Sequence, residues 1–345
     1  MTMPTTTPPA PASEKPVARL QKDEARVQKR EPATGWRVLL VPLTALLHVV
    51  DSEAPLAPRK PGRTGPELMR IAPFALMHIL CVLVVFVGFS WPAVVLTGAL
   101  YCIRMFAITG WYHRYFAHRS FKTSRAFQFV WGFIGCCAIQ KGPLWWAAHH
   151  RNHHRFSDQP EDTHSPRQSG FIYSHMGWFL TRKNFETRHH HIRDFTRYPE
   201  LRFLNRFDLL PPVLLGFALY GLGELIAAQA PGWGATGWQF VVWGILVSTV
   251  ICYHATYTIN SLSHVFGSQR FRTGDDSRNN FWLALLTFGE GWHNNHHHYQ
   301  SAVRQGFYWW EIDLTWYVLK MMSWVGLVWD LRPVPRAVKD GANAA

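Results

Sequence analysis

Four histidines fall within six residues near the middle of the chain, at His149, His150, His153 and His154. On an α-helix, residues three and four positions apart return to within roughly 60° and 40° of the same direction. His150, His153 and His154 would therefore share one helical face. No packing requirement gathers so many imidazoles, and imidazole is a common metal ligand, so this pattern predicts a metal-binding face.

The same spacing recurs near the C-terminus, where His293, His296 and His297 also fall on one side of a helix. A further pair, His113 and His118, has a spacing of five residues, which places the rings roughly 140° apart on a continuous α-helix. Either the helix ends between these two histidines, or they serve two different metals. Both alternatives favour a binuclear site.

Asn260 and His264, one helical turn apart, follow the last long apolar stretch and supply another pair of possible ligands. The clustered histidines then number nine, more than one metal would use. We predict two metal ions, with Asn260 as a tenth group that acts through water. Imidazole suits Fe, Zn, Cu and Ni, so the ligands alone do not choose the metal. The predicted histidine ligands are His113, His118, His150, His153, His154, His264, His293, His296 and His297.

Ligating histidines usually donate their second ring N–H to a carboxylate or a carbonyl. Four acidic residues lie close in sequence to the clusters, and we predict that Asp158 and Glu290, rather than Glu161 and Asp162, have this role. The other histidines are expected to bind no metal. These are His48, His78 and His254 as packing or polar-cavity residues, His189 to His191 as a solvated basic loop, and His149 and His298 as structural neighbours of the clusters.

The composition of the 345 residues excludes several classes of protein. The 5 cysteines lie in apolar surroundings without a CxxC pair, so we expect no disulfide framework, no Cys-ligated zinc and no iron–sulfur cluster. Any electrons must therefore come from elsewhere. The net charge of +13 accompanies no DNA- or RNA-reading motif, and we expect no nucleic-acid partner. With 48% hydrophobic residues and 17 Trp, the charge fits a membrane surface better.

Four apolar stretches, at about 71–89, 92–112, 209–229 and 237–259, are long enough to cross a bilayer. Arg104 is a charged residue inside the second of them. The stretch at 126–143 cannot cross, because one crossing would put the first two histidine clusters on opposite sides of the membrane. It is therefore expected to lie in the interface.

The distribution of charge predicts the orientation. The turn at 90–92 and the connection at 227–237 contain no Lys or Arg, whereas the N-terminal tail, residues 141–208 and the C-terminal part are rich in both. The sequence thus predicts an all-α membrane protein whose four transmembrane helices and interfacial helices carry a cytosolic helical cap, at 144–208 and 264–332, that holds the dimetal site. Both termini would be cytoplasmic. Residues 1–35 are expected to be a disordered tail, 36–332 the membrane domain and 333–345 a C-terminal tail.

Taken together, the motifs HxxxxH, HxxHH, NxxxH and HxxHH resemble those of membrane-bound fatty acid desaturases, in the acyl-CoA delta-9 (stearoyl-CoA desaturase-like) branch and of a bacterial type. The likeness covers about residues 70–332 and includes 171–178, Arg182 with Lys183, 260–267 and 289–291. This resemblance implies a centre of two non-haem iron ions that uses O2 as co-substrate. The reaction would remove hydrogen from carbons 9 and 10 of a saturated acyl chain and leave a cis alkene.

The resemblance also implies the partners of the protein. These would be a fatty acyl-CoA or another acyl carrier, a separate electron-donor protein with its reductase, and the lipid bilayer of a bacterial inner membrane. In the family, basic and polar residues hold the phosphates of CoA, and the matching residues here are Arg151, Arg182 and Lys183. A positive surface without a ligand would contain the same residues. The chain departs from animal members at His149, where they carry Asp, and at His298, which leaves the carrier open between CoA, another thioester and a lipid.

Two other functions remain open from the sequence. A membrane hydroxylase or ketolase acting on alkyl chains or carotenoids would use the same set of histidines. A non-catalytic metal-handling membrane protein would need polar residues along its spans, which are nearly free of them.

Overall fold

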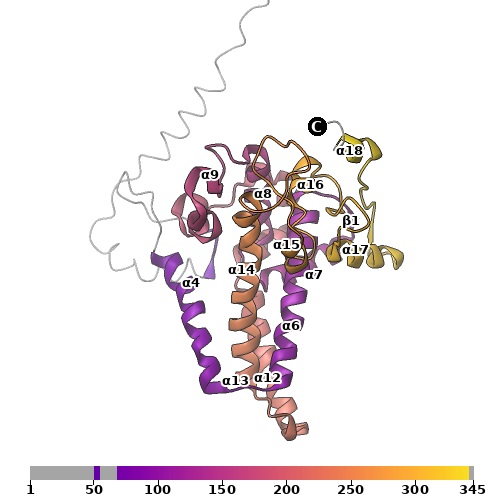
Figure 1. Cartoon of the computed structure of the whole chain (residues 1–345). Coiled ribbons are helices and arrows are strands. Elements are labelled where there is room, and N and C mark those ends of the chain that lie inside the picture. Colours follow the sequence, from indigo (N-terminus) through magenta and orange to yellow (C-terminus); the bar gives the residue numbers. More distant parts are fainter. Residues whose placement is uncertain (1–49, 55–67, 342–345) are drawn as a thin grey trace, which may run out of the picture. The chain divides into compact units, whose positions relative to one another are not determined.

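The computed structural model describes residues 50–54 and 68–341, which all belong to one compact unit. The predicted tail at 1–35, residues 36–49 with His48, and residues 55–67 and 342–345 lie outside the described residues. Within the described part the chain is mostly helical, with one short antiparallel pairing of β1 (Lys122–Thr123) with β2 (Val328–Trp329). In Figure 1 the long helices occupy the lower part of the described structure, and the shorter helices and loops gather around their upper ends.

Among the described residues, three helices are long and apolar enough to cross a membrane. The first consists of α6 (Trp91–Phe106) and its continuation η2 (Ala107–Ala117). The second is α12 (Leu210–Gln229). The third joins α13 (Gly237–Val241), η8 (Val242–Val247), α14 (Ser248–Asn260) and η9 (Leu262–His264). Their mean hydropathies lie between 1.5 and 1.6, and α14 packs against α6. Three of the four predicted spans are thus present as helices of sufficient length.

The first predicted span, at 71–89, is a shorter apolar helix over Ile71–Val87. It is divided into α4 (Leu68–Leu80), η1 (Cys81–Leu83) and α5 (Val84–Val87), and it ends at Gly88, whose φ of 73° a side chain would disfavour. The hydroxyl of Ser90 then accepts the N–H of Ala93 and caps α6, at the predicted turn. Large apolar side chains on α4 and α5, such as Ile79 and Phe86, are exposed, which requires an apolar environment for this helix too.

Arg104 in α6 does not reach the membrane surface. Its side chain is buried and donates from Nε to the carbonyl of Cys137, at 2.9 Å, and from Nη1 to that of Gly244, at 2.8 Å. The charge therefore faces protein, as expected for a guanidinium at this depth, and it joins α6 to η8 and to the end of α7 (Arg125–Cys136).

The helix α7 is too short to cross a bilayer and packs against η2. It leads into α8 (Pro143–Phe156), which also contacts η2. Because α7 does not cross, the histidines that end η2 and those of α8 reach the same side, as the parity argument requires.

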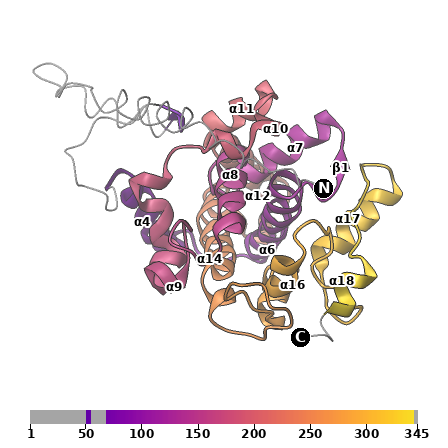
Figure 2. The same ribbon diagram turned by 90° about the horizontal axis from the view of Figure 1, so that it is seen from above.

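The remaining elements surround this end of the long helices (Figure 2). They are α9 (Pro166–Ser169), η3 (Tyr173–Gly177), η4 (Trp178–Leu180), η5 (Arg182–Asn184), η6 (His189–His191), α10 (Arg193–Thr196), α11 (Pro199–Arg206), α15 (Phe281–Leu286), α16 (His293–His298), α17 (Leu314–Trp324) and α18 (Arg336–Asp340). The helix η7 (Pro231–Trp233) lies in the connection between α12 and α13. The segment predicted as a C-terminal tail contains α18.

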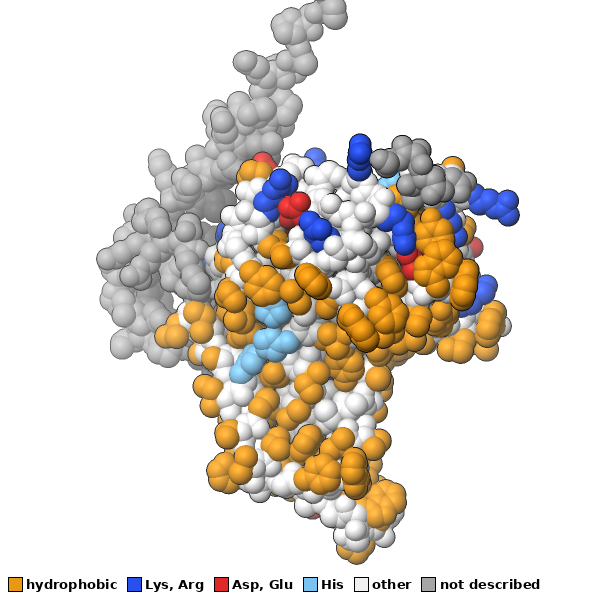
Figure 3. Space-filling view, viewed as in Figure 1, with side chains coloured by type: hydrophobic (Ala, Val, Ile, Leu, Met, Phe, Trp, Pro, Cys, Tyr) orange, Lys and Arg blue, Asp and Glu red, His pale blue; other side chains and the backbone are white. Residues whose placement is uncertain are grey.

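A chain of three imidazoles ties α4 to the rest of the unit. His78 Nε2 lies 3.1 Å from His254 Nε2, and His254 Nδ1 lies 3.0 Å from His175 Nε2. Figure 3 shows histidine side chains among hydrophobic ones on this face, with most Lys and Arg side chains farther toward the short helices. His78 and His254 therefore have the polar packing role that the sequence suggested.

Gly135 sets the close packing of α7 on η2. A Cβ at this position would lie 2.2 Å from Cε1 of the buried Tyr112 ring. We expect Gly135→Ala to lower the free energy of unfolding by about 1–3 kcal/mol, because the ring cannot withdraw without disturbing the helix that carries His113. Gly98→Ala on α6 is the matched control, since a Cβ there meets nothing within 4 Å. Thermal unfolding of the two variants in detergent, followed by circular dichroism, measures the difference; equal midpoints would refute the packing argument.

Candidate metal centre

The histidines at 113 and 118 lie at the end of a π-helix. In η2 the backbone is wound more widely than in an α-helix, and the N–H of His118 donates to the carbonyl of His113, five residues earlier, at 3.1 Å. The helix ends at Ala117, so His118 follows its last residue. The spacing left two alternatives, and the structure shows the first: the helix ends between the two histidines. Both rings belong to the same group of histidines.

The helices α8 and α16 each divide their histidines between two groups. His150 and His154 of α8 point into a first group and His153 into a second; on α16, His296 enters the first, and His293 and His297 enter the second. The helix α8 begins with Pro143 after Gly142, which fixes the start of the helix and hence the direction of its histidines.

The first group consists of five imidazoles that converge through their Nε2 atoms. All five offer nitrogens within 4.8 Å of one another. His113 Nε2 lies 3.0 Å from those of both His118 and His296, and the other neighbouring pairs are equally close. The members are His113, His118, His150, His154 and His296.

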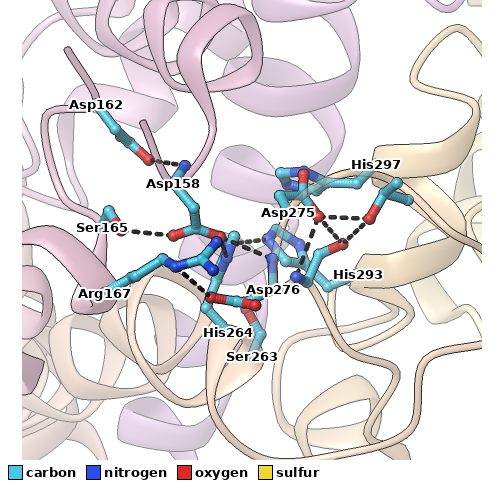
Figure 4. Close-up of polar contacts among 12 residues, drawn as sticks. Asp158, Asp162, Ser165, Arg167, Ser263, His264, Asp275, Asp276, His293 and His297 are labelled. Carbon is cyan, nitrogen blue, oxygen red and sulfur yellow. Dashed lines mark hydrogen bonds and ion pairs between the residues drawn. The ribbon is translucent and has the colours of Figure 1, made fainter. Parts of the chain in front are cut away.

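The second group consists of four buried imidazoles from three segments, His153, His264, His293 and His297. His264 Nε2 lies 3.1 Å from His293 Nε2, while the Nε2 atoms of His153 and His297 are buried without a hydrogen-bond partner. Figure 4 shows Asp158 directed at His264, and Asp275 beside His293 and His297. All nine histidines that the sequence singled out thus lie in one of two compact groups.

Four of the nine histidines contact a carboxylate through Nδ1, the ring nitrogen opposite the one that faces the group. The two predicted carboxylates are among these: Asp158 lies 2.9 Å from His264 Nδ1, and Glu290 lies 2.5 Å from His113 Nδ1. Two more were not predicted. Asp162 contacts His153 at 2.9 Å, and Asp275 contacts His297 at 2.6 Å.

The residues that were not predicted differ in whether the sequence pointed to them. Asp162 was one of the four acidic candidates near the clusters, but the prediction selected Asp158 and Glu290 instead. Asp275 lies in an irregular loop before α15, where no periodic signal could relate it to His297. His164 was overlooked; its ring stacks on that of His153 with centroids 4.2 Å apart, and it forms a third group with His153 and Asp162.

Burial sets the protonation of these groups. It lowers the pKa of His118, His150, His154, His293 and His296 well below the usual imidazole value, and neighbouring cationic imidazoles lower it further. Burial also lowers the pKa of His297, to about 4, although the Asp275 carboxylate opposes it. Burial alone would raise the pKa of Asp275, but its hydrogen bond to His297 lowers it below the usual carboxyl range. Near neutral pH these histidines are neutral and their carboxylates are charged.

Glu290 is held by glycines on both sides and by an arginine. Gly289 has a φ of 119°, and a Cβ at Gly291 would lie 2.1 Å from the backbone nitrogen of Ala284, so neither position accepts a side chain. Arg114 is buried and contacts both Glu290 at 3.0 Å and Asp313 at 2.9 Å. The motif at 289–291 therefore delivers one carboxylate to the Nδ1 of His113.

The two groups fit divalent metal ions of the kind that imidazole prefers. The imidazoles of each group bring their ring nitrogens close together, and carboxylates at the Nδ1 atoms of His113, His153, His264 and His297 direct the Nε2 lone pairs of these four rings into the groups. The buried Nε2 atoms of His153 and His297 have no other partner. This donor set admits iron and equally admits zinc, copper or nickel.

A large apolar cavity reaches the first group. Its empty volume is about 1360 Å³, including the part open to solvent, and His150 belongs to its wall. The wall is made chiefly of aromatic and aliphatic side chains from α4, α8, η4 and α14, with Asn260 and His164 among the few polar ones. Trp145 and Trp178 stack within the wall with ring centroids 5.5 Å apart. The cavity can hold an elongated apolar molecule against the metal ligands.

The three residues proposed for an acyl carrier lie in different places. Arg182 and Lys183 in η5 lie between Leu180 and Phe185, which line the cavity. Arg151 lies elsewhere, with its guanidinium on the carbonyls of Phe116, Ala117 and His191 and on the carboxylate of Asp194.

The histidines beside the clusters stay out of both groups. His149 Nε2 lies 3.2 Å from the carbonyl of Glu186, and the ring of His298 stacks on Phe271 with centroids 4.0 Å apart. His189 and His190 are exposed in η6, as expected for a solvated loop.

Comparison with known families and proteins adds an independent finding. The fatty acid desaturase family model matches residues 89–328. Delta-9 acyl-lipid desaturase 1 of Arabidopsis thaliana is 39% identical over 259 residues, which is 74% of this chain and 80% of the relative. The sn-1 stearoyl-lipid 9-desaturase of Synechocystis sp. is 39% identical over 72% of this chain and 74% of its own. An acyl-CoA 5-desaturase of Anemone leveillei is 39% identical over 76% of this chain and 78% of its own.

Removing the carboxylate behind His297 tests its role. We expect Asp275→Asn to weaken metal binding at the second group by about 10- to 100-fold, because the amide no longer offers His297 a negative charge. Equilibrium competition with a coloured chelator, with metal counted per chain by mass spectrometry, measures the change. Asp276→Asn is the matched control, since its carboxylate is more exposed and pairs only loosely, at 3.7 Å, with Arg167. Retention of wild-type affinity by Asp275→Asn would contradict the assignment.

Proposed function

The chain belongs to the fatty acid desaturase family, and from that premise we propose that it introduces a cis double bond at the delta-9 position of a long-chain saturated acyl thioester, in an O2-dependent reaction at a centre of two iron ions. The family makes it an oxidoreductase. The observation that carries the proposal is the apolar cavity, whose wall includes a histidine of the first metal group. An acyl chain in this cavity would lie against the metal ligands.

The substrate explains why a metal centre is needed. A methylene in an alkyl chain has no acidic proton, so acid or base catalysis by side chains cannot attack it. Two iron ions held by the nine histidines would supply, together with O2, the oxidant that removes its hydrogens. The donor set is compatible with iron, and the two groups provide one site for each ion.

The contribution of the chain's own residues is positioning. The cavity wall of Trp145, Trp178 and Phe179 excludes water and restricts the acyl chain to a narrow path. Because the ligands are fixed by carboxylates and the wall by stacked rings, only certain carbons can lie beside His150. The site of the new double bond would then be set by the length of chain between the carrier and this histidine.

The polar residues of the cavity wall are relevant to the identity of the carrier. Lys141 lines the cavity and contacts Asp208 at 3.4 Å and the hydroxyl of Ser52 at 2.6 Å. Arg182 and Lys183 add positive charge next to the wall, which supports a thioester whose carrier bears phosphates, as in acyl-CoA. The names of several relatives specify acyl lipids instead, so an acyl chain esterified in a lipid is the second candidate substrate.

We also propose the membrane arrangement. Three helices are long and apolar enough to span, and the exposed apolar surface of α4 and α5 supports a fourth, shorter crossing. With four crossings of a bacterial inner membrane, both termini and the metal centre face the cytoplasm. The excess of Lys and Arg around the metal centre supports this orientation.

Fatty acid analysis tests the function directly. A host without its own desaturase would express either this chain or His153→Ala, and total fatty acids would be profiled by gas chromatography–mass spectrometry after derivatisation of double bonds and hydroxyls. We expect a new cis delta-9 monoene with the wild type, and at least a 100-fold smaller amount with His153→Ala, because one metal group loses a ligand.

The same profile separates the other functions. An oxygenated chain in place of the alkene would identify a hydroxylase or ketolase. An unchanged profile from protein shown to contain iron, in cells supplied with a ferredoxin and its reductase, would favour a non-catalytic metal-binding protein.

The carrier is tested with purified holoenzyme. We expect Arg182→Glu with Lys183→Glu to raise the KM for stearoyl-CoA about tenfold or more and to leave kcat nearly unchanged, since these side chains would contact the carrier and not the reacting carbons. Arg182→Lys with Lys183→Arg is the charge-conserving control. If the wild type desaturates stearoyl groups in phospholipid vesicles and ignores stearoyl-CoA, the substrate is the acyl lipid.

A further inference from the structure

A second opening reaches the metal centre from outside the acyl cavity. It is lined by Ala117, His118, Arg151, His154, Arg155, Gln300 and Ser301, and it shares no lining residue with the acyl cavity. We call it the arginine opening. His118 and His154 belong to the first metal group, whose His150 lines the acyl cavity. The first group therefore lies between two openings, whereas the four histidines of the second group are buried and line neither.

The rim of the arginine opening is positively charged. Arg155 is exposed, with its guanidinium 5.3 Å from the centre of the Phe156 ring. Arg119, whose side chain is 58% exposed, lies next to His118 and contacts Asp194 at 3.4 Å. Arg151 contacts the same carboxylate at 2.9 Å. Arg119 and Arg151 thus share one carboxylate, and no carboxylate is paired with Arg155 among the described contacts, which leaves an excess of two positive charges around the opening.

The arginines also surround a histidine near the opening. Arg151 donates to the carbonyl of His191 at 2.9 Å. The pKa of His191 is lowered to about 4, first by burial and then by neighbours that include Arg188, Arg155 and Arg151. With the exposed side chains of Arg119 and Arg155, the surface near the opening is electropositive, which attracts an acidic partner.

The proposed reaction has an electron balance that the chain cannot meet alone. Desaturation follows R–CH2–CH2–R′ + O2 + 2 e⁻ + 2 H⁺ → R–CH=CH–R′ + 2 H2O, so two electrons enter in every turnover. The five cysteines are free thiols and form no pair that could store them. Under the proposed function, the acyl cavity is occupied by substrate during turnover. An electron donor must approach the metal groups by another route.

From these observations, and resting on the proposed function, we propose that the arginine opening is the docking site of an acidic one-electron carrier protein, and that electrons enter the first metal group through His118 and His154. The imidazole rings of these two residues connect the lining of the opening to the converging Nε2 atoms. Arg155 in the lining and the exposed Arg119 next to His118 supply the attraction, and the lining residues Gln300 and Ser301 are uncharged.

Anaerobic electron transfer without acyl substrate tests the proposal. Purified iron-loaded protein in detergent is mixed with a reduced plant-type ferredoxin that has an acidic surface, and the oxidation of the ferredoxin is followed by stopped-flow absorbance. We expect Arg119→Glu with Arg155→Glu to lower the second-order rate constant at least tenfold and to weaken its dependence on salt. Arg119→Lys with Arg155→Lys should keep most of the wild-type rate.

Two controls separate docking from damage to the metal centre. Arg202→Glu changes an exposed arginine on α11 that does not line the opening, and it should leave the rate unchanged. Reduction by photoreduced deazaflavin, a small uncharged reductant, should be equally fast in all variants. Iron content per chain is measured for each protein.

Three results would overturn the proposal. Equal ferredoxin rates for the wild type and the double glutamate variant would show that the opening does not dock the donor. Equal slowing with ferredoxin and with deazaflavin would place the effect in the metal group or in access of small molecules. If deazaflavin fails to reduce the wild type, the proposed redox function is wrong, and so is the docking site that rests on it. If deazaflavin reduces all variants normally and the charge reversal does not slow ferredoxin, only the docking site is wrong.

Discussion

The structure depends on a balance of charge around nine buried or half-buried imidazoles. Neighbouring Nε2 atoms approach to about 3 Å, and desolvation lowers the pKa of six of the rings, so that these rings do not relieve the repulsion by taking up protons. Four buried carboxylates stand behind them, at Asp158, Asp162, Asp275 and Glu290. Two divalent cations between the rings would neutralise these four negative charges, while Arg114 and Asp313 neutralise each other. The core of the cap is thus electrostatically complete as a metalloprotein and costly as a protein without metal.

The sequence was informative wherever ligands follow helical spacing. Six of the nine histidines could be identified because α8 and α16 repeat one motif, and the other three because they form the spaced pairs HxxxxH and NxxxH. The pairing of His113 with His118 required more than spacing, since it depends on a π-helix that ends at Ala117. Asp158 and Glu290 were found because they lie near the motifs in sequence. Asp275 was not, because the loop that brings it to His297 is irregular and its position is decided by tertiary packing.

For the fold, the sequence predicted the helices and turns but not the side-chain contacts that join them. Composition and hydropathy located three long helices and a shorter one, and charge-free stretches marked the turns at 90–92 and 227–237. The place of Arg104 could not be read, because a charged residue in a span can face lipid headgroups or protein, and only the carbonyls of Cys137 and Gly244 decide the matter. Nor could the sequence show that Arg151 joins η2 to Asp194, since a basic residue within a ligand motif suggests a phosphate as readily as a carboxylate.

The division of each histidine helix between two metal groups has a consequence for maturation. A first ion bound by His150, His154 and His296 would align α8 and α16 and so bring His153, His293 and His297 into place for the second. The conformational entropy lost in ordering these helices is then lost once, and the second ion binds more tightly than the first. Such coupling makes insertion nearly all-or-none. Newly made chains in a cell short of the metal would therefore divide into complete and empty proteins, with few half-filled ones.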